Sequence, residues 1–225
     1  PNKPLKLINN REMIFHVYEA AIKSNAGKVI VATPDKEIVD LIKRNNGNAI
    51  LTSAKHETGT DRVYEVFNNF LNAEPEIIIN LQGDMPNIDY KSISYLADYM
   101  SKNKCEVGTL ASDFSSIQER NDANNVKVVV EEKLLNNTFQ KALDFFRVDK
   151  SMNHVYHHIG IYGFTRNSLK KYVHLDRSKL ELERKLEQLR ALENDMAIHV
   201  GYTKFSPLSV DTEEDLKAVK KLMEI

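Results

Sequence analysis

The sequence predicts an α/β protein of three layers, α/β/α, around a mostly parallel central sheet. Short apolar runs rich in β-branched residues alternate with amphipathic stretches of helical length, which is the pattern of strands linked by crossover helices. The clearest runs are KVIVAT at 28–33 and EIIINL at 76–81, which indicate buried strands. The chain has 225 residues, of which 42% are hydrophobic and 28% charged, so it can bury a sizeable core.

Each further element follows from its local pattern. The spacing of apolar residues predicts a first helix over 13–22, and Gly27 ends that segment. A helix is expected at 37–44, and an Asn-Gly turn after it leads into a short strand at 49–52. Other helices are expected at 61–69, 91–102, 181–193 and 212–223, and other strands at 107–111, 126–131, 158–164 and 198–202.

Composition excludes several classes of protein. With 31 basic and 32 acidic side chains the formal net charge is −1, so nucleic-acid binding by bulk positive charge is not expected. Apolar runs reach only four or five residues, too short for a membrane-spanning helix. The single cysteine, Cys105, fits a reducing compartment, and no signal-peptide pattern opens the chain. We therefore expect a cytoplasmic protein without nucleic-acid or membrane partners.

The beginning of the chain is unusual for this fold class. A three-layer α/β domain usually opens with a strand, whereas this chain opens with Pro-Asn-Lys-Pro, which reads as a loop. We expect that a first strand and part of a loop precede Pro1. Lys3 could bind phosphate on such a loop, although a terminal lysine needs no function.

The triplet QGD at 82–84 directly follows the strand at 76–81. Ligands of open parallel sheets bind at the carboxyl ends of strands, where Asp84 could hold a Mg²⁺ ion bound to phosphates. A strand-end turn with a solvated aspartate explains the same residues.

A second aspartate, Asp211, immediately precedes the final predicted helix. Thr212 and Asp215 have the spacing of a capping box, so helix-start chemistry alone explains this segment. If Asp211 meets Asp84, the pair has the chemistry of a site for one Mg²⁺ ion.

Two polar segments could recognise a nucleotide or a sugar. The stretch 52–62 lies between a predicted strand and a predicted helix, and its hydroxyl groups, glycine and Arg62 suit a base edge and a ribose. A loop in which Thr60 caps the helix explains it equally. In HHIGIYGF at 157–164, His158 and Tyr162 could orient a hydroxylated sugar, or simply belong to an antiparallel strand.

The stretch ELERKLEQLR at 181–190 predicts a charged amphipathic helix. Its apolar stripe is Leu182, Leu186 and Leu189, and its charged residues, Arg190 included, are expected on a solvated face.

Eight segments carry a resemblance to a known family: PNKPL at 1–5, KVIVAT at 28–33, HETGTDR at 56–62, INLQGD at 79–84, NNVKVV at 124–129, HHIGIYGF at 157–164, LEQLR at 186–190 and VDTEEDL at 210–216. In this order they resemble the 3-deoxy-manno-octulosonate (Kdo) cytidylyltransferases, the CMP-Kdo synthetases of Gram-negative bacteria. The sialic acid cytidylyltransferases share the fold and the opening loop, but are not expected to show HIGIYGF and LEQLR in this arrangement.

The resemblance implies a Rossmann-like nucleotidyltransferase fold in one domain over 1–225, with a smaller strand-rich insertion at about 105–165 for dimerisation and sugar binding. It implies a Mg²⁺-dependent reaction in which CTP and Kdo give CMP-Kdo and pyrophosphate, activating Kdo for lipopolysaccharide assembly. The family commonly forms homodimers.

By motif, the resemblance implies three catalytic residues: Asp84 and Asp211 to hold the metal, and Lys3 to bind the triphosphate. The nucleotide contacts that it implies are Lys3, Ala32, His56, Gly59, Arg62 and Gln82. The sugar contacts that it implies are Gln82, Lys141, His158, Tyr162, Glu187 and Gln188.

The chain also departs from the family pattern. The family's nucleotide loop begins upstream of Lys3 with an Arg- and Ser-containing segment, and that segment is not in this sequence. Met85 stands where the family has Glu, and Lys141 stands where it has Arg, which removes a bidentate donor for a carboxylate. Two alternatives therefore stay open: a cytidylyltransferase for another acidic sugar (sialic acid or 8-amino Kdo), and a non-catalytic nucleotide-binding protein.

Overall fold

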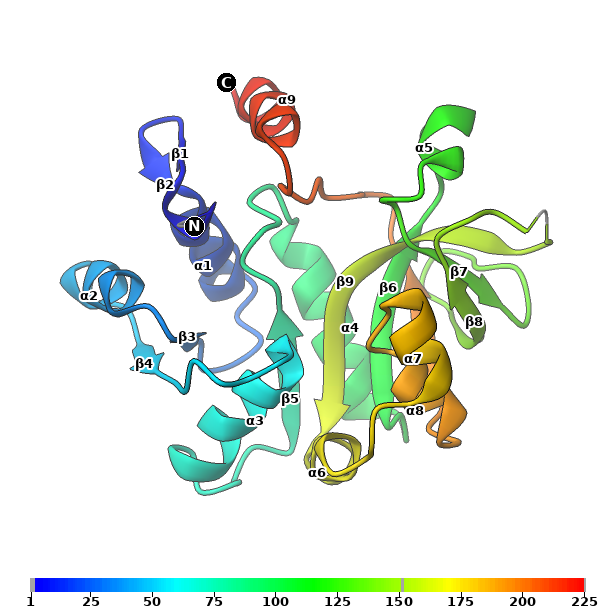
Figure 1. Ribbon diagram of the computed structural model, residues 1–225, viewed down its shortest axis with the longest axis horizontal. Coiled ribbons are helices and arrows are strands. Elements are labelled where there is room, and N and C mark those ends of the chain that lie inside the picture. Colours follow the sequence, from blue (N-terminus) through cyan, green and yellow to red (C-terminus); the bar gives the residue numbers. More distant parts are fainter. Residues whose placement is uncertain (1–2, 151, 225) are drawn as a thin grey trace. The chain divides into compact units, whose positions relative to one another are not determined.

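The computed structural model describes residues 3–150 and 152–224, so Pro1 and Asn2 of the opening loop lie outside it. Its residues group into two compact units (Figure 1). Unit 1 is Pro1–Asn72, Leu81–Tyr95 and Pro207–Ile225, and unit 2 is Ala73–Asn80 and Leu96–Ser206. None of the helices in the described ranges has the length and apolar character needed to cross a membrane. The single domain over 1–225 and its insertion stay predictions.

Unit 1 is built from short strands and amphipathic helices. Strands β3 (Val31–Thr33) and β4 (Ala49–Leu51) pair in parallel, as the crossover through α2 (Lys36–Arg44) requires. Its other elements are η1 (Lys3–Leu5), β1 (Leu7–Ile8), β2 (Arg11–Glu12), α1 (Met13–Lys23), α3 (Gly59–Asn69), α9 (Glu213–Met223) and the first part of α4 (Tyr90–Lys102).

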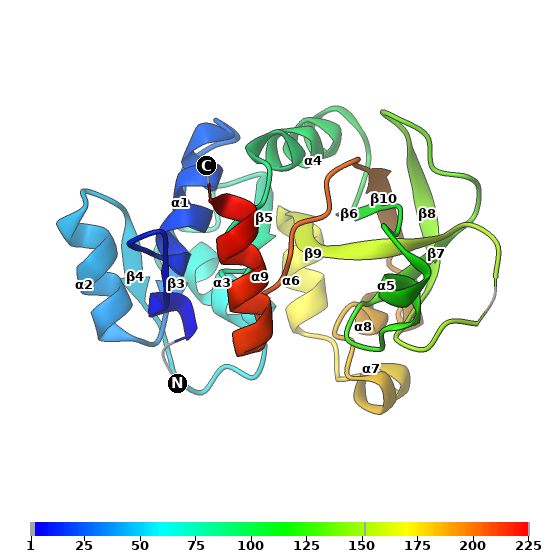
Figure 2. The same cartoon turned by 90° about the horizontal axis from the view of Figure 1, so that it is seen from above.

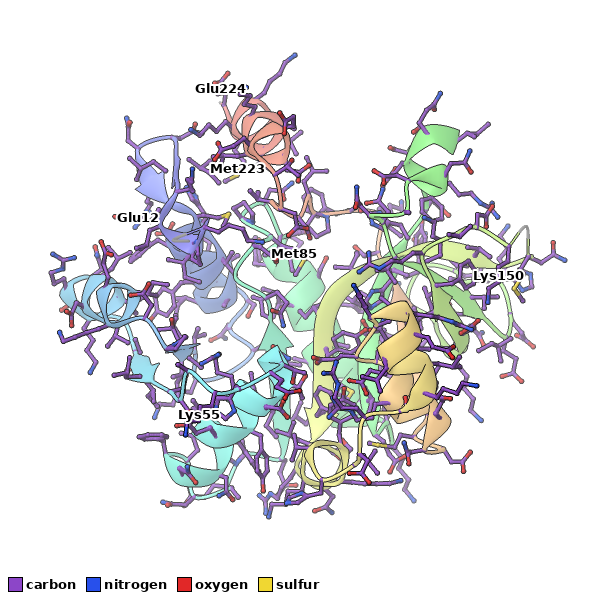
Figure 3. All side chains as sticks on the ribbon, viewed as in Figure 1. Glu12, Lys55, Met85, Lys150, Met223 and Glu224 are labelled. Carbon is purple, nitrogen blue, oxygen red and sulfur yellow. The ribbon has the colours of Figure 1, made fainter. Side chains whose placement is uncertain are left out.

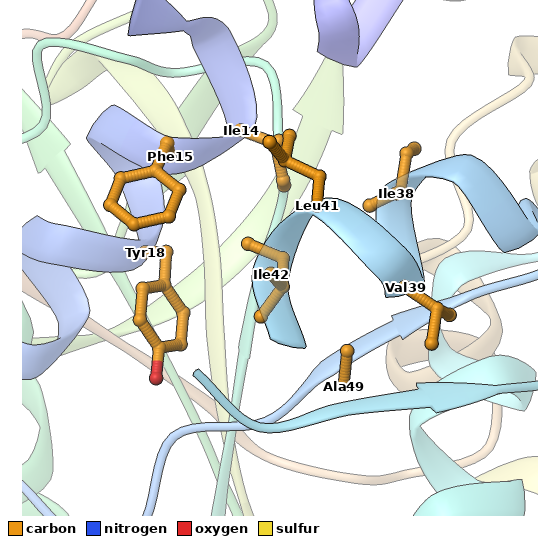
Figure 4. Packing of buried hydrophobic residues seen from close by; sticks show 8 residues of the cluster. All are labelled: Ile14, Phe15, Tyr18, Ile38, Val39, Leu41, Ile42 and Ala49. Carbon is orange, nitrogen blue, oxygen red and sulfur yellow. The ribbon is translucent and has the colours of Figure 1, made fainter. Parts of the chain in front are cut away.

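The main core of unit 1 joins α1 to α2 (Figure 4). Helix α2 begins where Asp35 accepts a hydrogen bond from the Glu37 amide at 2.8 Å, a standard N-cap. Its apolar face packs against α1 and β4, and each fully buried aliphatic side chain contributes about 1.5–3 kcal/mol. The buried cluster consists of Ile14, Phe15, Tyr18, Ile38, Val39, Leu41, Ile42 and Ala49.

A second core of unit 1 fixes the segment that leads into α9. Val210 is buried with Ile8 and Met13 and with two residues of α9, Leu216 and Val219. Helix α9 packs against β1, so the C-terminal segment is tied to the beginning of the chain. The packing of Val210 against these residues therefore fixes the backbone that leads into Asp211.

Unit 2 contains a six-stranded sheet in the order β5-β9-β6-β10-β8-β7. In Figures 1 and 2 the long strand β9 curves through it. The strands are β5 (Ile77–Leu81, whose last residue belongs to unit 1), β6 (Val107–Ser112), β7 (Lys127–Val130), β8 (Phe139–Phe146), β9 (Val155–Thr165) and β10 (Ile198–Tyr202). The helices are α5 (Ile117–Asn121), α6 (Arg166–Val173), α7 (Lys179–Arg184), α8 (Leu189–Glu193) and the rest of α4.

The α/β class is as predicted, but a mostly parallel sheet is wrong for unit 2. Strand β10 runs parallel to β6, whereas β9 is antiparallel to β6 and β7, and β8 is antiparallel to β7 and β10. The cause is connection length, because β7, β8 and β9 follow one another through short loops. A parallel pair needs a crossover of a dozen or more residues, usually a helix.

Two local predictions are also corrected. The helix expected over 181–193 is broken into α7 and α8, because Lys185 adopts a left-handed conformation with φ 54°. Leu182 is exposed, whereas Arg190, expected on a solvated face, is buried. Helix α3 begins two residues earlier than expected, because Thr58 rather than Thr60 caps it.

Candidate functional site

Asp84 lies in the turn that follows β5, in unit 1. A Cβ atom at Gly83 would lie 2.8 Å from the Ile14 side chain, so glycine lets this turn pack closely on α1. Met85, labelled in Figure 3, is 2% exposed and belongs to the hydrophobic core. The turn therefore presents Asp84 while the next side chain faces inward, at the position where the resemblance predicted an acidic one.

Asp211 is held by the start of α9. Asp215 accepts hydrogen bonds from the amides of Asp211 at 3.0 Å and Thr212 at 2.8 Å, and Thr212 caps the Asp215 amide in return, so the predicted capping box is present. The Val210 amide donates to the Asp84 carbonyl at 2.9 Å. This bond joins two segments that are far apart in the sequence.

Lys3 lies between the two carboxylates. Its Nζ atom is 3.1 Å from Asp84 Oδ2 and 3.0 Å from Asp211 Oδ1. Burial pulls the pKa of Lys3 down, but the charges and hydrogen bonds of the two aspartates outweigh this and raise it above its ordinary value. The Asp84 side chain is 28% exposed and that of Asp211 72%, so both can reach a ligand in solvent. All three predicted catalytic residues meet at one point.

The donor set at this point suits a divalent cation. Two carboxylate oxygens already share one ammonium group, which shows that they can converge on a single cation. Mg²⁺ typically takes one or two carboxylates and completes its shell with phosphate oxygens and water. Across 3–150 and 152–224, no group of three or more His, Cys, Asp or Glu side chains has the arrangement of a metal site. Asp84 and Asp211 could therefore hold a metal only together with substrate oxygens or water.

The predicted nucleotide-binding residues also belong to unit 1. The Arg62 guanidinium donates to Thr52 Oγ1 at 2.6 Å and to the Ser53 carbonyl at 2.9 Å, which fixes it at the end of β4. His56 contacts the Glu65 carboxylate, and this hydrogen bond holds the pKa of Glu65 below its ordinary value.

Gly59 and Gln82 lie beside each other in the same unit. A Cβ atom at Gly59 would come within 2.9 Å of the Gln82 amide nitrogen, so a larger residue would displace that amide. Ala32 lies in β3 opposite Ile50 of β4. At the end of the same two strands, the Thr52 amide donates a hydrogen bond to the Thr33 carbonyl at 2.9 Å. The structure therefore gathers Ala32 and the residues of the β4–α3 loop at neighbouring strand ends.

The predicted sugar-binding residues other than Gln82 belong to unit 2. His158 Nε2 is 2.9 Å from the Tyr162 hydroxyl and 3.0 Å from the hydroxyl of Thr109 on β6. Burial, and to a lesser degree the charge of His157, lowers the pKa of His158 to about 3, so its ring is neutral at physiological pH. Sequence reasoning missed Thr109, because a threonine in a buried strand is an ordinary β-sheet residue.

Tyr162, Glu187 and Gln188 line one small pocket of unit 2, together with Val107, Phe164, Tyr172, Ala191 and Ile198. Burial raises the pKa of Tyr162 well above its ordinary value, and the nearby charge of Glu187 adds to the effect. Lys141 is exposed on β8, where it pairs with His199 of β10, and it is not among the residues that line this pocket.

Comparison with known structures gives first the class of protein. A solved structure of CMP:2-keto-3-deoxy-manno-octonic acid synthetase complexed with CTP has a TM-score of 0.89 with this chain, at 34% identity, covering 99% of this chain and 92% of that one. A Bacillus anthracis structure named as a glucose-1-phosphate thymidylyltransferase shares the fold at a TM-score of 0.68 and 13% identity, covering 98% and 86%. The fold is therefore that of the sugar nucleotidyltransferases.

Comparison of sequences then gives the family. A family model described as cytidylyltransferase matches residues 1–198. The 3-deoxy-manno-octulosonate cytidylyltransferase of Thermodesulfovibrio yellowstonii is 39% identical and that of Paramagnetospirillum magneticum 36%, each over 99% of this chain and 92% of its own length. The chain belongs to the cytidylyltransferase family, which confirms the predicted resemblance.

The buried neutral His158 predicts a pH-dependent stability. Its pKa is about 3 in the folded protein and 6.5 ordinarily, so between these values the unfolded chain binds a proton that the folded chain does not. The free energy of unfolding should therefore fall as the pH drops below 6.5, by about 1.4 kcal/mol per pH unit for this one group. His158→Gln should flatten that slope in urea unfolding between pH 7 and pH 5, whereas His174→Gln should not. Equal slopes in wild type and His158→Gln would contradict this.

The shared ammonium of Lys3 predicts a change in metal affinity. Lys3→Met leaves two carboxylates without their cation, so Mn²⁺ should bind about tenfold more tightly in the absence of nucleotide. Titration followed by the electron paramagnetic resonance of free Mn²⁺ measures this directly. Lys6→Met is the matched control, since Lys6 bonds to Glu213 instead. Unchanged or weaker Mn²⁺ binding by Lys3→Met would show that the carboxylates do not form a metal site.

Proposed function

We propose that this chain transfers CMP from CTP to Kdo, giving CMP-Kdo and pyrophosphate and so activating Kdo for lipopolysaccharide assembly. The observation that carries the proposal is the similarity over nearly the full length to relatives named for this reaction, one of them solved with CTP. The convergence of Asp84, Asp211 and Lys3 supports it, because transfer from a nucleoside triphosphate needs a site for a metal and for phosphates.

The chemistry asked of the chain is mainly positioning. An oxygen–phosphorus bond forms between the anomeric oxygen of the sugar and the α-phosphorus. The bond from that phosphorus to the β-phosphate oxygen breaks, and the hydroxyl proton leaves to solvent or a base. Asp84 and Asp211 would hold a Mg²⁺ ion, and Lys3 would donate to the triphosphate. When bound, this ion would neutralise phosphate oxygens and polarise the attacking hydroxyl.

The remaining residues would select the substrates. Arg62, held by Thr52 and Ser53, offers fixed donors to the cytosine edge, and His56, Gly59 and Ala32 accompany it in unit 1. Tyr162, Glu187 and Gln188 in unit 2 would bind hydroxyl groups of the sugar acid, and His158 would orient Tyr162. Gln82 is proposed for both ligands. We also propose a cytoplasmic location, because the reaction consumes CTP, a cytoplasmic metabolite.

Substrate choice has one specific alternative. Lys141 offers one ammonium group where the family has an arginine, whose planar guanidinium could bind a carboxylate through two hydrogen bonds. Sialic acid and 8-amino Kdo are the other acidic sugars to compare with Kdo in direct competition. A higher kcat/KM for either would reassign the substrate while leaving the reaction class unchanged.

The central test is pyrophosphate release from CTP and Kdo in the presence of Mg²⁺. We expect turnover by the wild type and a loss of at least about a hundredfold in kcat for Asp84→Asn and Asp211→Asn, because each removes a charge from the metal site. Asp40→Asn is the control, since Asp40 pairs with Lys36 on α2 instead. CTP binding by calorimetry without any pyrophosphate release would instead indicate a non-catalytic nucleotide-binding protein.

We further propose a homodimer that uses the region 105–165. Large apolar side chains in this region are exposed in the single chain, among them Ile117, Leu143 and Val148. Such residues on a protein surface mark interaction sites when they are contiguous. Sedimentation of the wild type as a dimer and of Leu143→Glu as a monomer is expected, and a monomeric wild type at micromolar concentration would contradict the proposal.

A further inference from the structure

The turn between α7 and α8 carries two of the proposed sugar contacts, Glu187 and Gln188. It is not held by a long helix, because α7 ends at Arg184 and Lys185 is left-handed. Its backbone is instead fixed from outside. The Glu187 carbonyl accepts a bond from the Tyr172 hydroxyl of α6 at 2.8 Å and another from the Arg190 amide at 3.1 Å.

A buried ion pair closes the other side of this turn. Arg190 is 3% exposed and Glu181 0%, and the guanidinium donates to both carboxylate oxygens, at 2.9 Å from Nε and 2.7 Å from Nη2. The same carboxylate also accepts from Arg177 Nε at 3.1 Å and from the Ser178 amide at 3.2 Å. Burial raises the pKa of Glu181, but the charge and hydrogen bonds of Arg190, together with the hydrogen bonds from Ser178 and Arg177, lower it below its ordinary value, so the carboxylate stays charged.

Tyr172 connects the ion pair to the turn. The Arg190 guanidinium lies over its ring, 4.7 Å from the ring centre, while its hydroxyl reaches the Glu187 carbonyl. Tyr172 also lines the small pocket that is lined by Glu187, Gln188 and Tyr162. Glu181, Arg190 and Tyr172 thus form one continuous contact chain that ends at the proposed sugar contacts.

A buried ion pair often adds little to the stability of the folded state. Removing two charges from water carries a penalty that their attraction often fails to recover, and well-packed apolar replacements are frequently as stable or more so. A bidentate pair does fix distance and orientation, because the planar guanidinium meets the carboxylate in one geometry. We therefore attribute to this ion pair the role of fixing the relative position of Glu181 and Arg190, rather than that of adding stability.

We propose that Glu181, Arg190 and Tyr172 are positioning residues that hold the Glu187–Gln188 turn in the conformation that binds the sugar acid. The identity of the ligand rests on the proposed function, whereas the fixation of the turn does not. Glu181 and Arg190 are not required to touch the sugar, and the Tyr172 hydroxyl acts through the backbone of the turn, although the Tyr172 ring also lines the pocket.

The test compares two altered proteins with one control. Tyr172→Phe removes only the hydroxyl that reaches Glu187. The double variant Glu181→Leu/Arg190→Met replaces the ion pair with apolar side chains of similar size. Glu183→Gln is the matched control, since Glu183 forms an exposed pair with Lys179 on the same helix, at 3.8 Å.

We expect the KM for Kdo to rise about fivefold in Tyr172→Phe and about tenfold or more in the double variant, with the KM for CTP unchanged. The unfolding temperature should stay near that of the wild type in both. Amide hydrogen exchange in the turn should become faster in both, and Glu183→Gln should match the wild type throughout.

An unchanged KM for Kdo in both variants overturns the proposal, and so does a parallel rise of both KM values with a lowered unfolding temperature, which indicates general damage. If the wild type itself releases no pyrophosphate from CTP and Kdo, the proposed function fails instead. The exchange measurement then still decides the structural claim, because faster exchange in the turn at an unchanged unfolding temperature supports it and unchanged exchange refutes it.

Discussion

The convergence of Asp84 and Asp211 on one cation position is the constraint around which unit 1 is organised. Neither aspartate is placed by its own side chain. Asp84 follows a glycine that packs directly against Ile14, and Asp211 follows the buried Val210, whose amide bonds to the Asp84 carbonyl at 2.9 Å. Asp215 then fixes the Asp211 backbone through the cap of α9. Two carboxylates that contact the same ammonium group would repel one another in its absence. The Lys3 ammonium offsets that repulsion in the free protein.

The two units provide different kinds of chemistry because their candidate residues have different environments. In unit 1, Lys3, Asp84 and Asp211 are charged and at least partly exposed, as suits metal and phosphate oxygens. In unit 2, His158 and Tyr162 are buried neutral groups that hydrogen-bond to each other. Neutral donors and acceptors in a water-poor setting suit the hydroxyl groups of a sugar, since an unmatched ligand would leave buried polar atoms without partners.

Much of the fold could be predicted from periodicity. Helices α2 and α9 and strands β5 and β10 lie within a residue or two of their expected positions, because their patterns and caps are local. Strand β8 was not predicted, since Gln, Lys and Asp interrupt its apolar residues. The break at Lys185 was not predicted either, because lysine gives no signal for a left-handed conformation. The candidate residues came from motifs, but the meeting of Asp84 with Asp211 and the burial of Arg190 depend on contacts between distant segments, which no local pattern contains.

The most direct measurement of the central claim is a crystal structure of the protein with CTP and Mn²⁺, in which anomalous scattering locates the metal. One manganese peak coordinated by a carboxylate oxygen from each of Asp84 and Asp211, with Lys3 moved from the carboxylates to the phosphates, is the expected result. A metal that contacts only one of these aspartates, or that binds elsewhere while Lys3 stays between them, would contradict it.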